Sequence, residues 1–136
     1  MKHRAITLAA VTAVLALGTG AGQASAAEEL IGYPGPDGVI WVPEVTGSSG
    51  FVSAGLNAHL DTSTTFACEG GGSIEVSFHF HNQPDRDPAP FTLDCPPDTP
   101  SRVTVPLGTG LSGSFGATVT ASSPSIRWGA VVVQPE

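Results

Sequence analysis

Lysine is nearly absent from this chain: Lys2 is the only one. Four arginines complete the cations, and the first of them, Arg4, stands beside Lys2 at the start. The chain beyond residue 26 therefore keeps three arginines against twelve acidic residues, a formal net charge of −9. Such a surface repels phosphate backbones and anionic lipid headgroups. The composition argues against nucleic acids and membrane surfaces as partners.

Long hydrophobic runs are also missing: the longest, over residues 5–17, has about 13 residues, whereas a membrane-spanning helix needs about 20. Lys2, His3 and Arg4 precede this run, and a small-x-small sequence follows it at residues 24–26. This order is typical of a secretory signal peptide over residues 1–26, cleaved after Ala26 or after Ala27. No cysteine stands directly after the cleavage site, so we expect no lipid anchor. The protein is predicted to be secreted and extracellular.

Only two cysteines are present, Cys68 and Cys95, and they do not form a Cys-x-x-Cys pair. Two thiols are too few for a zinc cluster, which disfavours a dithiol metal or redox site. In an exported protein an even number of cysteines indicates disulfide bonds, and two cysteines allow one pairing. We predict a Cys68–Cys95 disulfide, whose loop of about 27 residues should stabilise the fold by roughly 3–4 kcal/mol.

Helical periodicity is absent beyond the first 26 residues, whereas glycine (17) and proline (12) are frequent in the chain. Apolar and polar residues alternate instead, most clearly over residues 74–81. The two faces of that segment are Ile74, Val76, Phe78 and Phe80, and Glu75, Ser77, His79 and His81. Seven to eight such segments recur about every 10 residues. This predicts an all-β fold, a Greek-key or immunoglobulin-like β-sandwich, with a small barrel as the alternative.

Two parts are expected in the exported chain. Residues 27–50 are interpreted as an N-terminal extension with one short edge strand at 39–42, which Pro43 interrupts. Residues 51–136 are predicted to form the β-sandwich domain, whose first strand, at 52–60, should place Val52, Leu56 and Leu60 on the core side. Further strands are expected at 64–68, 74–81, 91–95, 103–107, 115–121 and 126–132. Whether the extension packs on the domain is left open.

The disulfide restricts how three of these strands are arranged. Cys68 and Cys95 share the parity of the apolar residues in their segments, so both sulfurs should point to the core. Strands that flank a third strand in one sheet lie about 9–10 Å apart, whereas a disulfide needs alpha carbons within about 7 Å. We therefore expect strands 64–68 and 91–95 to pair directly or to face each other between two sheets.

Three sequence features together resemble a known group. They are Cys-Glu-Gly-Gly-Gly-Ser-Ile-Glu-Val at residues 68–76, Phe-Thr-Leu-Asp-Cys at 91–95 and Ile-Arg-Trp-Gly-Ala-Val-Val at 126–132. Over about residues 66–133 the chain resembles small exported one-disulfide β-sandwich proteins of actinobacteria, an uncharacterised group with some lipoprotein members. The resemblance implies export and a β fold, and no activity. The lipobox of the lipoprotein members is missing here, which implies an untethered protein.

His79 and His81 form the sharpest candidate for chemistry. On a strand both imidazoles project from one face, about 7 Å apart, and Glu75 lies on the same face. The adjoining loop offers Asp85 and Asp87. Two histidines and a carboxylate can bind zinc or copper. A solvated polar strand face explains the same alternation without a ligand, and it is the favoured interpretation.

No catalytic motif emerges from the chain. His59 and Asp61 share a strand face and would need a serine to form a hydrolase dyad, but Gly-Leu-Ser-Gly-Ser at 110–114 lacks the Gly-x-Ser-x-Gly spacing. Asp85-Arg86-Asp87 lacks the spacing of a calcium loop. Phosphate-loop, dinucleotide and zinc-protease motifs are missing. We expect no enzymatic activity and no cofactor.

Aromatic residues offer one further possibility. Tyr33 and Trp41 could form a platform for a sugar ring, as in a carbohydrate-binding module, although core packing is favoured for Trp41 and for Trp128. The sequence is thus best interpreted as a secreted, non-enzymatic β-sandwich that binds an extracellular protein, a cell-wall polymer or itself. The alternatives are zinc or copper binding through His79 and His81, and carbohydrate binding.

Overall fold

The computed structural model describes residues 30–136, so the expected signal peptide and its cleavage positions lie outside the described residues. The described chain forms strands and one short 3-10 helix, η3 (Pro84–Arg86). No helix in this part could cross a membrane. The strands are β2 (Gly38–Thr46), β3 (Ser49–Leu56), β4 (Thr62–Glu69), β5 (Gly72–Phe80), β6 (Phe91–Cys95), β7 (Ser101–Gly108), β8 (Gly113–Ala121) and β9 (Arg127–Val133).

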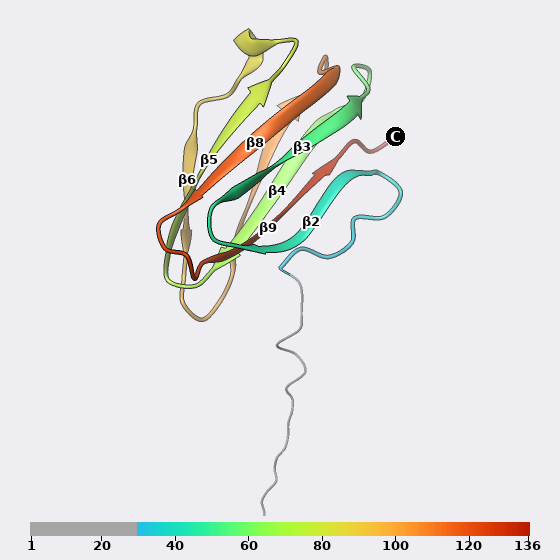
Figure 1. Cartoon of the computed structure of the whole chain (residues 1–136). Helices are drawn as coiled ribbons and strands as arrows, with labels where there is room; N and C mark the ends of the chain where they lie inside the picture. Colours follow the sequence, from blue (N-terminus) through green and yellow to red (C-terminus); the bar gives the residue numbers. More distant parts are fainter. Residues whose placement is uncertain (1–29) are drawn as a thin grey trace, which may run out of the picture.

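The strands form two four-stranded antiparallel sheets, in the orders β2-β9-β4-β7 and β3-β8-β5-β6 (Figure 1). The predicted all-β Greek-key sandwich is confirmed. Its strand order is that of an eight-stranded jelly roll, in which the chain passes back and forth between the sheets. An immunoglobulin domain would instead keep its first two strands in one sheet, whereas β2 and β3 lie in different sheets here.

The core lies between the sheets and is rich in aromatic rings. The ring of Phe66 lies 6.0–6.4 Å, between centroids, from those of Phe51, Phe78, Phe91 and Trp128. These edge-on and tilted contacts are the favoured arrangements for aromatic pairs. The indole N–H of Trp128 donates to the carbonyl oxygen of Gly47 at 2.8 Å, so this fully buried side chain leaves no polar group unpaired.

The disulfide joins the two sheets. Cys68 lies near the end of β4 and Cys95 is the last residue of β6, with alpha carbons 5.0 Å apart. Both residues are buried. The predicted Cys68–Cys95 pairing is confirmed. Because β4 and β6 belong to different sheets, the predicted placement of the disulfide between two sheets is confirmed as well.

The N-terminal part of the described chain belongs to the sandwich itself. β2 is longer than the expected segment at 39–42, because it continues past Pro43 through an irregularity between Val42 and Val45. It pairs on one side with β9 and forms the edge of its sheet, where proline is tolerated because no ladder donor is needed. The expected boundary between residues 50 and 51 falls inside β3 (Ser49–Leu56). Residues 38–50 are therefore not an extension beside the domain.

The prediction for the first strand of the domain, at residues 52–60, is wrong both in the side chains that face the core and in the length of the strand. Val52 is 63% exposed and Ser53 only 3% exposed, the reverse of the expected pattern. A register shift between Ser53 and Leu56, at which Gly55 has a φ of 76°, then returns Leu56 to the core. A bulge of this kind reverses the face of every residue on one side of it. The chain leaves the strand after Leu56, so residues 57–60 form a turn.

Candidate functional site

The two outer faces of the sandwich differ in what lies on them. Residues 30–33 run across the outer face of β2-β9-β4-β7, which we call the covered face. Leu30 and Ile31 pack there on Ala67 and Val131, and Ile31 is only 2% exposed. The outer face of β3-β8-β5-β6 carries no such segment within residues 30–136, and we call it the open face.

Specific contacts hold this segment on the covered face. The Trp41 indole N–H donates to the carbonyl oxygen of Ile31 at 2.9 Å, and the Arg102 guanidinium donates to that of Leu30 at 3.1 Å. Gly129 lies beneath, where a Cβ would come within 3.1 Å of the Ile31 side chain and 2.7 Å of the Pro43 carbonyl oxygen. A side chain at residue 129 would therefore push the segment and the edge strand away.

Tyr33 and Trp41, the candidate sugar platform, are in contact. Their ring centroids lie 5.3 Å apart, but the planes are inclined by 69°, so the two rings do not form one flat surface. Tyr33 is 71% exposed, whereas Trp41 is half-buried and its N–H already has a partner. Both residues line a hollow of about 190 Å³. The tyrosine ring is the part of this pair that a ligand can reach.

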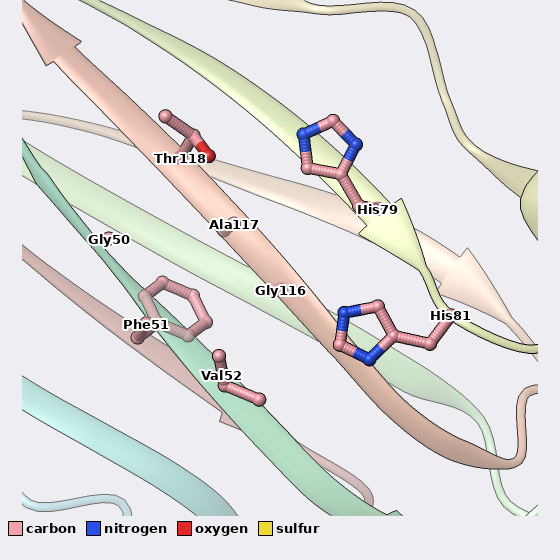
Figure 2. Close-up of a pocket in the computed structure, with 8 residues that line it drawn as sticks. All are labelled: Gly50, Phe51, Val52, His79, His81, Gly116, Ala117 and Thr118. Atoms are coloured by element: carbon pink, nitrogen blue, oxygen red, sulfur yellow. The ribbon is translucent and has the colours of Figure 1, made fainter.

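The open face contains a larger hollow, of about 380 Å³ (Figure 2). Val52 on β3 and His79 on β5 both stand opposite Gly116 on β8, so two side chains flank a position that has none. Gly50 adds a second bare stretch of backbone, because a Cβ there would collide with the carbonyl oxygen of Ala117. We call this feature the open-face hollow, and its lining residues are Gly50, Phe51, Val52, His79, His81, Gly116, Ala117 and Thr118.

The two imidazoles beside this hollow are held differently. His81 Nδ1 lies 2.8 Å from the hydroxyl oxygen of Ser114, and its ring extends toward Gly116 (Figure 2). The side chain of His79 is 59% exposed, with Nδ1 4.0 Å from a carboxylate oxygen of Asp87. Both rings can accept or donate hydrogen bonds, according to their tautomers.

The expected metal ligands are not assembled around one point. Glu75 is exposed on β5, but within residues 30–136 no three histidine, cysteine, aspartate or glutamate side chains are grouped so that they could hold a metal ion. Zinc or copper binding by His79 and His81 stays a prediction for which the described chain supplies no third ligand.

The loop after β5 uses its charged residues for its own structure. Asp87 accepts a hydrogen bond from the Phe80 amide at 2.7 Å, and Arg86 donates to the carbonyl oxygen of Thr109 at 2.9 Å. Gln83 donates to the carbonyl oxygen of Gly110 and accepts from the Ser112 amide. These contacts fasten the loop to the turn before β8, and Asp85, Arg86 and Asp87 do not form a calcium-binding group.

His59 and Asp61 do not share a strand face, because they follow β3 in the turn at 57–61. The His59 amide donates to the side-chain oxygen of Asn57, and both residues are exposed. Within the described chain no hydrogen bond joins the His59 imidazole to a serine or to Asp61, and this hydrolase hypothesis has no geometric basis.

Sequence reasoning missed the residues that shape the open-face hollow. Gly50 and Gly116 belong to no motif, and the alternation of residues 52–60 places Val52 on the core side. The available signal was Gly55, since a glycine inside an alternating segment often marks a bulge. Sequence reasoning also missed the ion pairs of Arg127 on the covered face, which join it to Glu44 at 2.8 Å and to Glu69.

Comparisons with known proteins identify no relative. No family model matches the chain, and no curated protein matches it. A solved structure from work describing Bacillus endospore appendages as a family of disulfide-linked pili matches at 8% identity and a TM-score of 0.34. That match covers 71% of this chain and 85% of the other. A TM-score this low supports no inference about this chain, and the resemblance to exported actinobacterial proteins stays a prediction.

Proposed function

We propose that this protein is an exported, non-enzymatic binding protein whose open face binds an extracellular protein or a cell-wall polymer. The observation that carries the proposal is the contrast between the outer faces. The chain covers one with Leu30 and Ile31, whereas the other holds the open-face hollow beside Val52, which is 63% exposed.

The composition of this hollow suits binding. Val52 offers apolar surface, and His79, His81 and Thr118 offer hydrogen-bonding groups around it. Binding sites commonly combine an apolar lining with a few polar groups. The hydrogen bond to Ser114 orients the His81 ring, whereas the more exposed His79 ring, 4.0 Å from Asp87, is free to turn toward a ligand.

Gly116 provides a direct test of the hollow. A Cβ at this position would meet neighbours at ordinary distances, 3.5 Å from the Phe51 carbonyl oxygen and 3.9 Å from His81 and Val52. Gly116→Ala should therefore fold, and it should gain about 0.5–1 kcal/mol from replacing a strand glycine. The new methyl group would occupy the floor of the hollow. We expect a more stable protein that binds its ligand less well.

The experiment measures co-sedimentation of the mature, oxidised protein with purified cell walls and its chemical cross-linking to secreted proteins. Gly116→Ala and Val52→Glu are compared with Thr104→Glu, an exposed position on the covered face. We expect both open-face variants to lose about tenfold in affinity, or about 1.4 kcal/mol, and Thr104→Glu to bind normally. Equal binding by all variants, or a loss confined to Thr104→Glu, would refute the proposal.

Carbohydrate binding at Tyr33 is a second candidate. The favouring observation is its 71% exposed ring, which lies against Trp41 beside a hollow on the opposite side of the molecule. A sugar stacked on Tyr33 should alter the fluorescence of the adjacent indole, so titration with soluble cell-wall oligosaccharides measures it. The change should vanish in Tyr33→Ala and persist in Gly116→Ala. A titration unaffected by Tyr33→Ala would exclude this site.

A further inference from the structure

Within residues 30–136 the sandwich has four edge strands, and they are unequally protected against pairing with another chain. β2 contains Pro43 and Glu44, and β7 contains Arg102 and Pro106. β6 has only five residues, one of them Asp94. Prolines, charges and short length are the usual means by which an edge strand avoids added strands. β3 (Ser49–Leu56) has eight residues and none of these features.

The part of β3 with regular strand geometry is the segment Ser49–Ser53. On one side it pairs residue by residue with β8, from Ser49 opposite Val119 to Ser53 opposite Phe115. Its other side has no strand partner within the described chain, because β3 ends the order β3-β8-β5-β6. The irregularity before Leu56 would stop a longer ladder. Five residues are therefore available for an added strand.

This segment is complementary to itself. If two copies pair antiparallel about a two-fold axis through Phe51, Gly50 of one copy lies opposite Val52 of the other. Residues that share parity on a strand project from the same face, so each exposed Val52 would stand beside the bare backbone at Gly50. Phe51 would face its own counterpart on the core side, and aromatic cross-strand pairs are favourable.

We propose that two copies of this chain associate through β3, forming a continuous eight-stranded sheet in the order β6-β5-β8-β3-β3-β8-β5-β6. The two open-face hollows then lie side by side across the two-fold axis, since Gly50 and Val52 line each of them. The inference is independent of the proposed ligand binding, because the backbone edge of β3 makes the contact without any ligand.

The association is expected to be weak and to depend on salt. Five paired residues bury less surface than a standard interface, which suggests a dissociation constant of about 10–100 µM. Each mature chain has a formal charge of −9, whereas β3 itself is uncharged. Salt screens repulsion between the two acidic domains. The dimer should therefore tighten as sodium chloride is raised.

Sedimentation velocity of the mature, oxidised protein without ligand tests the proposal, from about 1 µM to about 1 mM, a range that spans such a constant. Val52→Glu would place a carboxylate on each copy near the two-fold axis, and we expect about a hundredfold weaker association. Thr104→Glu, an exposed position on edge strand β7, should associate like the wild type. The milder Val52→Thr should weaken the dimer by about threefold. Near-ultraviolet circular dichroism verifies that each variant is folded.

Amide hydrogen exchange at low and high protein concentration locates the contact. Protection that grows with concentration should be confined to Ser49–Ser53. A monomer at every concentration overturns the proposal, as does a dimer that Val52→Glu leaves intact or one whose added protection falls on β7. Ligand binding by a monomeric protein would refute this dimer and leave the proposed function standing.

Discussion

Removing the Cys68–Cys95 bond should cost the protein a large share of its stability. The bond closes a loop over a sequence separation of 27 residues. In the chain-entropy description, opening such a loop gives the unfolded chain about 3.5 kcal/mol of additional freedom. A domain of this size typically has 5–15 kcal/mol in total, so about a quarter to about two thirds of that would be lost.

The structure also says where the loss should appear first. Among the described strands, β6 is an edge strand of five residues that pairs with β5 alone, and the disulfide links its last residue to β4 in the other sheet. Without that link, the end of β6 is held by its ladder with β5 and by the amides of Gly70 and Gly71, which donate to the carbonyl oxygens of Pro96 and Cys95, and residues 96–100 are exposed. Local opening should therefore begin there, because short edge strands occupy the low-stability end of a fold.

Urea unfolding followed by tryptophan fluorescence measures the global effect. Cys68→Ala combined with Cys95→Ala is compared with thiol-reduced wild type, which keeps both side chains and controls for lost packing. We expect each to lose about 3–4 kcal/mol, or about 15 °C in Tm. Hydrogen exchange should rise earliest in β6. A loss below about 1 kcal/mol, or a reduced protein as stable as the oxidised one, would refute the loop-closure reasoning.

Three further predictions concern single side chains, and urea midpoints measure all of them. Ile31→Ala should cost about 2–4 kcal/mol, because Ile31 is buried on the covered face; a cost near zero would show that residues 30–33 do not hold that face. Trp128→Phe should cost about 1–3 kcal/mol, because the buried carbonyl oxygen of Gly47 loses its donor. Ser53→Ala should stabilise by about 1 kcal/mol, because the buried Ser53 hydroxyl has no partner among residues 30–136; a destabilised protein would indicate a hidden partner.

Local sequence pattern predicted the strands that are regular over their whole length. In β5 the alternation is uninterrupted, so Ile74, Val76 and Phe78 are buried and Glu75 and His79 are exposed, as expected. The disulfide placement was also predictable, because strand spacing and disulfide reach are fixed lengths. Both inferences needed only neighbouring residues or a covalent constraint.

Long-range packing decided the features that were not predicted. The jelly-roll order joins β2 to β9, so residues about 90 positions apart are neighbours, and no local pattern reports that pairing. The face of β3 depended on one irregularity near Gly55, and a single residue of slip exchanges the exposed and buried sets. That slip brought Val52 out to the surface, and this exposure underlies both proposals.

The candidate site shows the same division. The sequence indicated that His79 and His81 share an exposed face, but the neighbours that define their surroundings come from β3 and β8. Gly116 stands opposite both Val52 and His79, although these residues are 27 positions apart in the chain. Such convergence of distant residues requires the fold. The hollow was therefore invisible in the sequence even though the histidines were not.

Glycine explains why the two outer faces can behave differently. On the covered face, Gly129 lets Ile31 and the backbone of β2 approach β9, so the missing side chain is compensated by a contact within the chain. On the open face, Gly116 leaves room that an alanine methyl group would fill at ordinary distances, and no described residue occupies it. A strand glycine costs about 0.5–1 kcal/mol relative to alanine. Packing within residues 30–136 does not offset the cost of the glycine at residue 116, whereas contacts with a molecule bound in the hollow would offset it.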